Sequence, residues 1–212
     1  MSELFDRERV TEVEVPAVPL PDRPREEPRP AAPEPAPEPE APVEHAAGDF
    51  KVPEGYSVLE GAVRGEQRSV AIVVSRFNAE ITGAMLEQAL AELDNVGVPR
   101  ASVTVMPVPG AFELPLGAMA LAKTRRFACV VALGCVIRGE TSHFDYVAGE
   151  AASGLQLAGI ETGVPVAFGV LTTETREQAE ARIDRAVDAV RSALEMADLF
   201  GALRARTASA AS

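Results

Sequence analysis

Apolar and polar residues follow a repeating order along the second part of the chain. Short runs that are apolar almost throughout predict buried strands, and each is followed by a segment whose apolar spacing predicts a helix. The strands are expected at residues 69–75, 101–108, 127–133 and 165–171, and the helices at residues 79–96, 112–122 and 144–160, with a last helix starting at Thr173. The buried face of that last helix is expected to consist of Ala179, Ile183, Ala186, Val190, Leu194 and Ala197.

This alternation predicts an α/β fold. Buried strands joined through helices by short connections are typical of a doubly wound three-layer sandwich with a four-stranded parallel sheet, of the flavodoxin-like kind. Residues 56–63 alternate weakly and are expected to add an N-terminal edge strand. We therefore expect one domain over residues 56–203, followed by a short disordered C-terminal tail over residues 204–212.

Residues 1–55 differ in composition from the rest of the chain. They hold 14 of the 32 acidic residues and 12 of the 17 prolines, and residues 28–42 alternate proline with alanine and glutamate. Such a segment has too little apolar surface to build a core, and it stays extended and solvated. We expect a disordered, acidic, Pro/Glu/Ala-rich arm in front of the domain.

Charge and composition exclude several classes of protein. The net charge of −12 argues against nucleic acid or an anionic membrane as a partner. No apolar run approaches the ~18 residues of a membrane span, and the N-terminus lacks the apolar core of an export signal. Cys129 and Cys135 would lie about 20 Å apart in one strand, too far for a disulfide. Two reduced cysteines without an export signal favour the cytoplasm.

The predicted strand ends carry the candidate chemistry, because the carboxyl ends of parallel strands meet at one edge of the sheet. Phe77 either stacks on a heteroaromatic ligand or belongs to the core. The backbone around Gly110 and Ala111 can pair with a planar donor and acceptor edge. Glu113 either accepts from ligand hydroxyls or simply places a charge at a helix start. Residues 139–141, in a glycine turn before a helix, can bind an anion.

His143 is the candidate for proton transfer. It lies in the first turn of a predicted helix, and histidine is suited to moving protons near neutral pH. The other histidine, His45, lies in the arm. A single histidine at a helix start is more often a cap or a surface residue, but the neighbouring candidates favour catalysis. The sequence contains no nucleotide P-loop, G-x-G-x-x-G fingerprint, G-x-S-x-G elbow or metal-ligand cluster.

Four blocks of residues, in this order, are similar to the signature blocks of one enzyme family. They are Ser75–Asn78, Val108–Pro115, Ile137–Val147 and Phe168–Thr173. Over about residues 56–200 the chain resembles the 6,7-dimethyl-8-ribityllumazine synthases of riboflavin biosynthesis. The resemblance implies condensation of 5-amino-6-(D-ribitylamino)uracil with 3,4-dihydroxy-2-butanone 4-phosphate, which releases phosphate and water. It implies neither a metal nor an organic cofactor.

The resemblance also implies a role for individual residues. His143 would transfer protons, and Phe77 would stack on the pyrimidine. The remaining substrate contacts would come from Ala111, Phe112 and Glu113 at the ribityl chain, Cys135, Val136 and Ile137 at the ring through their backbone, Glu140, Thr141 and Arg182 at the phosphate, and Phe168 from a neighbouring subunit.

The family forms pentamers, in some members assembled into hollow icosahedral shells of 60 subunits, so a homo-oligomer is implied. One feature of the sequence departs from the family. After Arg182 the chain is about five residues short and lacks a lysine that usually helps to bind the phosphate. Either Arg185, which lies three residues after Arg182 and is expected on the same helix face, replaces this lysine, or Arg185 is a solvated residue of its helix face. The arm is a further addition, which is interpreted as a spacer, as solubilising bulk, or as a segment that docks or packages a protein partner.

Two other functions compete with the enzyme. A weakly active or inactive homologue would act as a shell-forming scaffold or a lumazine- or flavin-binding protein whose arm recruits a partner. The shortened phosphate segment favours this alternative, whereas His143, Phe77 and Glu113 favour the enzyme. A flavodoxin-like FMN or signalling domain is the third interpretation, but the acidic residues that a receiver domain clusters at its strand ends are absent from this sequence.

Overall fold

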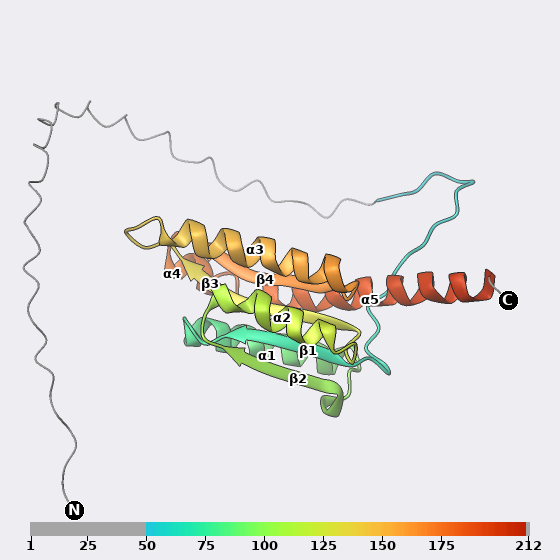
Figure 1. Cartoon of the computed structure of the whole chain (residues 1–212), viewed down its shortest axis with the longest axis horizontal. Coiled ribbons are helices and arrows are strands. Elements are labelled where there is room, and N and C mark those ends of the chain that lie inside the picture. Colours follow the sequence, from blue (N-terminus) through green and yellow to red (C-terminus); the bar gives the residue numbers. More distant parts are fainter. Residues whose placement is uncertain (1–49, 211–212) are drawn as a thin grey trace, which may run out of the picture. The chain divides into compact units, whose positions relative to one another are not determined.

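The computed structural model describes residues 50–210, and Figure 1 shows strands and helices alternating along them. Residues from Val52 onward belong to one compact unit. The elements are β1 (Val70–Ser75), α1 (Ala79–Asn95), a short 3-10 turn (Arg100–Ser102), β2 (Val103–Val108), a second 3-10 turn (Ala111–Glu113), α2 (Leu114–Lys123), β3 (Cys129–Ile137), α3 (His143–Thr162), β4 (Val166–Thr173), α4 (Arg176–Glu180) and α5 (Arg185–Ala210).

The four strands form one parallel sheet in the order β2-β1-β3-β4. The two central strands consist of Val, Ile, Ala, Leu, Cys and single Ser and Gly residues, and β1 is buried along its whole length. Strands covered on both faces are apolar throughout, as this composition requires. Since β1 pairs with β2 from Val70↔Val103 to Ser75↔Val108, the carboxyl ends of these strands lie level with each other. The α/β prediction with a four-stranded parallel sheet is confirmed.

The helices cover both faces of the sheet and bury alternate residues of each strand. Val70, Ile72 and Val74 of β1 pack with α1 and α5 on one face. Ala71 and Val73 pack with α2 and α3 on the other. The predicted buried face of the last helical segment is confirmed at Ala179, Ala186, Val190, Leu194 and Ala197, whereas Ile183 is only partly buried.

The C-terminal region differs from the prediction of one last helix. Thr173 ends β4, where it pairs with Ile137, and the helix cap is Thr175, whose hydroxyl accepts from the Gln178 N–H at 3.3 Å. The helix then breaks between α4 and α5. In the break the N–H of Arg182 donates to the Ala179 carbonyl, three residues back, so the regular four-residue spacing is lost. Aspartate at position 184 is compatible with such a break because it is a weak helix former.

The two chain ends also differ from expectation. Residues 56–63 form no strand within the described chain, and the sheet has four strands. Helix α5 continues to Ala210, so residues 204–210 of the predicted disordered tail are helical. The predicted arm lies outside the described residues up to residue 49, as does His45. None of the helices between residues 50 and 210 combines the length and the apolarity of a membrane span.

Candidate ligand-binding cleft

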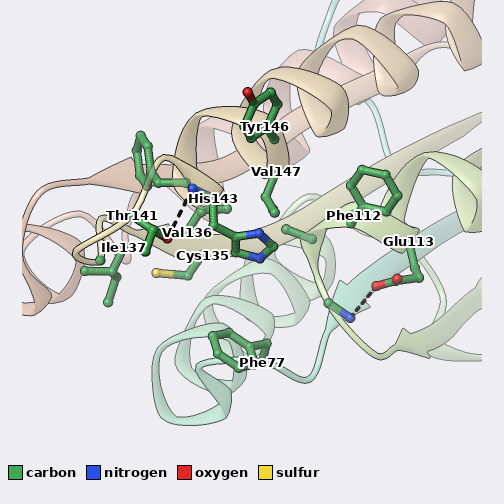
Figure 2. Close-up of a pocket in the computed structure, with 14 residues that line it drawn as sticks. Phe77, Phe112, Glu113, Cys135, Val136, Ile137, Thr141, His143, Tyr146 and Val147 are labelled. Atoms are coloured by element: carbon green, nitrogen blue, oxygen red, sulfur yellow. Dashed lines mark hydrogen bonds between the residues drawn. The ribbon is translucent and has the colours of Figure 1, made fainter. Parts of the chain in front are cut away.

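A cleft of about 570 Å³ lies at the carboxyl ends of β1, β2 and β3. This is the edge at which open α/β sheets bind ligands, and the volume suits a small molecule. Three turns, β1–α1, β2–α2 and β3–α3, meet there with the first two turns of α3 (Figure 2). The lining residues are Phe77, Gly110, Ala111, Phe112, Glu113, Cys135, Val136, Ile137, Gly139, Thr141, His143, Phe144, Tyr146 and Val147.

Phe77 lies in the β1–α1 turn and faces solvent at the cleft. Its side chain is 70% exposed, so it is not a core residue. Hydrogen bonds fix the turn on both sides. The N–H groups of Arg76 and Phe77 donate to the carbonyls of Val108 and Pro109, at 2.8 and 3.1 Å. Asn78 has a left-handed backbone, with φ 57°, and its Nδ2 donates to the Cys135 carbonyl at 3.0 Å. The ring of Phe77 is therefore held beside the ends of β2 and β3.

The β2–α2 turn forms one wall of the cleft with its backbone, and a hydrogen bond within the turn holds it closed. The Gly110 N–H donates to Glu113 Oε2 at 2.9 Å, which ties the turn to the start of the next helix. A Cβ at position 110 would lie 3.1 Å from that same oxygen, so glycine keeps the approach free. Glu113 thus has a structural role at the helix start, as one of its two interpretations expected. Ala111 is buried against the sheet, while Phe112 is exposed at the cleft.

The end of β3 forms the floor of the cleft. Cys135 is only 2% exposed, and burial raises the pKa of its thiol to about 11. Burial likewise raises the pKa of the Cys129 thiol to about 12. Because the thiolate is the nucleophilic form, neither cysteine is an effective nucleophile near neutral pH. Both cysteines are free, in agreement with the predicted absence of a disulfide. Cys135 therefore contributes shape and backbone groups to the site.

His143 begins α3 and its imidazole points into the cleft, with Phe77 and Phe112 on either side of it (Figure 2). Its backbone N–H donates to Thr141 Oγ1 at 3.4 Å. The preceding residues 139–142 are exposed and form a turn whose backbone leads directly into the helix start. The cleft thus joins a ring surface, a titratable imidazole and a turn of the kind that binds anions.

Most of the residues predicted for the site meet in this cleft, but three do not line it. Glu140 is exposed in the β3–α3 turn, without reaching the lining. Phe168 lies in a separate hollow with Ile160 and Phe200. Arg182 lies in the break between α4 and α5, where its Nη1 donates to the Gln178 carbonyl at 2.8 Å.

The predicted relation between Arg182 and Arg185 is wrong. The two arginines do not share a helix face, because α5 begins only at Arg185. Arg185 is exposed and pairs with Asp188 at 3.0 Å, on its own helix. This position matches the interpretation of Arg185 as a solvated residue.

Three lining residues were missed as site residues: Phe144, Tyr146 and Val147. A signal for two of them was available. Tyr146 and Val147 follow His143 by three and four positions, and residues with that spacing lie on one face of a helix. Any helix that turns His143 toward a ligand also turns these two residues toward it.

The fold and the cleft define an α/β protein with a cleft of small-molecule size at the carboxyl edge of a parallel sheet. Comparison with known proteins narrows this class. A sequence model of the family described as 6,7-dimethyl-8-ribityllumazine synthase matches residues 67–201. Similar proteins carry the same name in Edwardsiella ictaluri (strain 93-146), at 49% identity over 156 residues, and in Yersinia pestis (strain Pestoides F), at 47% over 154 residues.

These alignments cover 98% and 99% of the two relatives, and 69% and 70% of this chain. A relative from Yersinia pseudotuberculosis serotype O:1b (strain IP 31758) matches to the same extent as the Yersinia pestis protein. The chain belongs to the 6,7-dimethyl-8-ribityllumazine synthase family. The resemblance seen in the four sequence blocks is confirmed.

Proposed function

We propose that this protein is a 6,7-dimethyl-8-ribityllumazine synthase of riboflavin biosynthesis. It condenses 5-amino-6-(D-ribitylamino)uracil with 3,4-dihydroxy-2-butanone 4-phosphate and releases phosphate and water. The observation that carries the proposal is the coincidence of two findings: the family match over residues 67–201, and a cleft within that region that offers an aromatic surface, a backbone edge and an imidazole together.

The pyrimidine ring is assigned to the space beside Phe77. The exposure of this side chain supports the assignment, because an aromatic ring at a cleft offers a stacking face that a ligand can cover. The backbone groups of Cys135, Val136 and Ile137 are assigned to the polar edge of the ring. Their place at the floor of the cleft supports this role.

The ribityl chain is assigned to the wall formed by Ala111, Phe112 and Glu113. Glu113 uses Oε2 to accept from the Gly110 N–H, and within residues 50–207 no hydrogen bond engages its Oε1. An ionised carboxylate oxygen is a strong acceptor for a hydroxyl. A hydroxyl of the ribityl chain can therefore bind Oε1 while the turn stays closed.

The phosphate of the second substrate is assigned to the β3–α3 turn. Thr141 offers its hydroxyl, and the start of α3 offers backbone N–H groups and the positive end of the helix dipole. Glu140 is assigned a backbone contact, because its carboxylate and the phosphate carry the same sign of charge. Arg182 is assigned to the same phosphate as its side-chain cation, although Arg182 does not line the cleft of its own chain.

His143 is assigned the proton transfers. Condensation of an amine with a ketone expels water, so the departing oxygen must receive a proton, and the amine must lose one. A positioned imidazole can serve both steps, as acid in one and base in the other. The direction of the His143 side chain into the cleft, between the proposed ring and phosphate positions, supports this role (Figure 2).

The enzyme is further proposed to work as a homo-oligomer: a pentamer, with a 60-subunit shell as the larger alternative. Large apolar side chains on α3 and β4 support an assembly, because Ile160 is 71% and Phe168 47% exposed in the single chain. Phe168 is proposed to close the cleft of a neighbouring subunit. The catalytic domain is proposed to span residues 56–203, and the acidic arm in front of it is proposed to recruit a protein partner. The enzyme is proposed to work in the cytoplasm without a cofactor. Its two free, buried cysteines fit that compartment.

The test is a reaction with purified full-length protein and both substrates, followed by the fluorescence of the lumazine product and by phosphate release. Product is expected only when both substrates are present, with lumazine and phosphate formed in equal amounts. Replacement of His143 by alanine should lower turnover about 100- to 10,000-fold without loss of folding. Tight binding of the product without any turnover of the wild type would instead identify a binding or scaffold protein.

A further inference from the structure

Arg138 joins three segments at the edge of the cleft. Its Nη1 and Nη2 donate to the two carboxylate oxygens of Asp145, at 3.2 and 2.9 Å. Its Nε donates to Glu174 at 3.0 Å, and its backbone N–H donates to the Thr173 carbonyl at 2.9 Å. The guanidinium also lies 4.1 Å from the centre of the Phe144 ring. One side chain thus connects the end of β3, the first turn of α3 and the β4–α4 turn.

The turn that Arg138 spans has little else to hold it. Residues 139–142 are all exposed, and a Cβ at Gly139 would meet no atom within 4 Å. Its local hydrogen bonds are the long contact from the His143 N–H to Thr141 Oγ1 and one from the Asp145 N–H to the Ser142 carbonyl at 3.1 Å. The turn therefore has no anchor in the core. The paired hydrogen bonds from Arg138 to the carboxylate of Asp145 (the Asp145 fork) close the turn at its base.

The chemistry of this contact requires an arginine. A planar guanidinium matches both oxygens of a carboxylate and presents a third N–H in another direction, which a lysine ammonium cannot do with the same geometry. The ring of Phe144 adds a cation–π contact to the same guanidinium. Asp145, and then Glu174, raise the pKa of the guanidinium above its already high value, so it stays charged at every working pH.

Arg138 does not line the cleft, whereas Gly139, Thr141 and His143 do. Its N–H groups point to Asp145 and Glu174, and so it is not arranged to take a substrate phosphate. Resting on the proposed function, we propose that Arg138 is a positioning residue for the reaction. Through the Asp145 fork and the Glu174 contact it fixes the turn at residues 139–142, and with it the place of the His143 imidazole relative to the two substrates.

The test compares Arg138→Gln and Arg138→Lys with a matched control, Arg100→Gln. Arg100 forms a similar two-point contact to Asp94 through Nε and Nη2, is exposed, and lies outside the cleft lining. Turnover, the Michaelis constants for both substrates, the melting temperature and amide hydrogen exchange by mass spectrometry are measured for each protein. Asp145→Asn serves as a second variant if Arg138→Gln fails to fold, because it weakens the same fork and leaves the arginine in place.

Arg138→Gln should lower turnover about 10- to 100-fold, the size of effect expected when a catalytic group is displaced by about 1 Å. Amide exchange should rise in the peptide that covers residues 139–143 and stay unchanged in the sheet. Arg138→Lys should fall between wild type and Arg138→Gln, while Arg100→Gln should keep wild-type turnover.

Wild-type turnover with unchanged exchange in Arg138→Gln would overturn the inference. A loss of turnover without faster exchange would also overturn it, because Arg138 would then act on the substrate directly. If the wild type itself forms no lumazine, the proposed function fails, and the exchange measurement still decides whether Arg138 holds the turn.

Discussion

Asn78 offers the sharpest test of how the aromatic surface of the cleft is held. It occupies the left-handed backbone region, φ 57° and ψ 45°, directly after Phe77, and its side chain donates to the Cys135 carbonyl at 3.0 Å. Asparagine visits this region more readily than alanine, for which it costs on the order of 1 kcal/mol. The lost hydrogen bond costs about 1 kcal/mol more. Asn78→Ala should therefore destabilise the protein by about 2 kcal/mol.

Asn78→Gly separates the two contributions. Glycine adopts the left-handed conformation without strain, so this variant should lose only the hydrogen bond, about 1 kcal/mol. For chains of this size 1 kcal/mol corresponds to about 2–4 °C in melting temperature, and so Asn78→Ala should lose roughly twice as many degrees as Asn78→Gly. Both variants should bind a ribityl-pyrimidine more weakly, since each frees the turn that carries Phe77.

Calorimetry and ligand titration measure both effects. Asn95→Ala is the control, because Asn95 lies at the far end of the same helix and donates to Glu92 at 3.2 Å without touching the cleft. It should lower the melting temperature slightly and leave ligand affinity unchanged. If Asn78→Gly destabilises as much as Asn78→Ala, the strain argument is refuted. If neither changes ligand affinity, the turn does not position Phe77.

The other predictions concern the ring, the thiol, the phosphate and the assembly. Phe77→Ala should weaken binding of a ribityl-pyrimidine about 2- to 10-fold, and Phe77→Tyr should restore it, as titration can show. Iodoacetamide at pH 8 should leave Cys135 unmodified in the folded protein, because its pKa of about 11 keeps the thiol neutral; mass spectrometry reads this out. Arg182→Ala should raise the Michaelis constant for the butanone phosphate about 10- to 100-fold, and that for the pyrimidine far less; Arg185→Ala should change neither. Deletion of residues 1–50 should leave an active oligomer by native mass spectrometry, whereas deletion of residues 1–64 should disrupt it. A monomer from the shorter deletion would contradict the proposed domain boundary.

The parallel sheet was predictable because burial on both faces demands apolar strands, and residues 70–75 and 129–137 carry that pattern. The end of β3 was less predictable. Gly134 interrupts the apolar run, yet it lies inside β3. A Cβ at this position would come within 2.8 Å of Leu114 Cδ1, so the close packing between strand and helix requires glycine here. A glycine required by close packing between a strand and a helix looks the same in sequence as one that ends a strand.

The candidate site was predictable where the fold alone brings residues together. Phe77, Glu113 and His143 each follow a strand, and parallel strands collect their carboxyl ends at one edge. Arg182 and Phe168 could not be placed in this way. The break between α4 and α5 moves Arg182 out of the helix in which it was expected, and Phe168 lies in a different hollow. Periodicity predicts which residues share an element, but it does not predict where a helix bends or what a neighbouring copy contributes.

The place of the pyrimidine substrate tests the central claim most directly. A structure of the protein with a ribityl-pyrimidine bound, determined at a concentration that saturates turnover, would locate the ring by its density. The account predicts the heteroaromatic ring against Phe77, within reach of the His143 imidazole, and the ribityl chain along Ala111 to Glu113. A ring bound elsewhere, for example in the hollow beside Phe168 and Phe200, with the cleft empty, would contradict it.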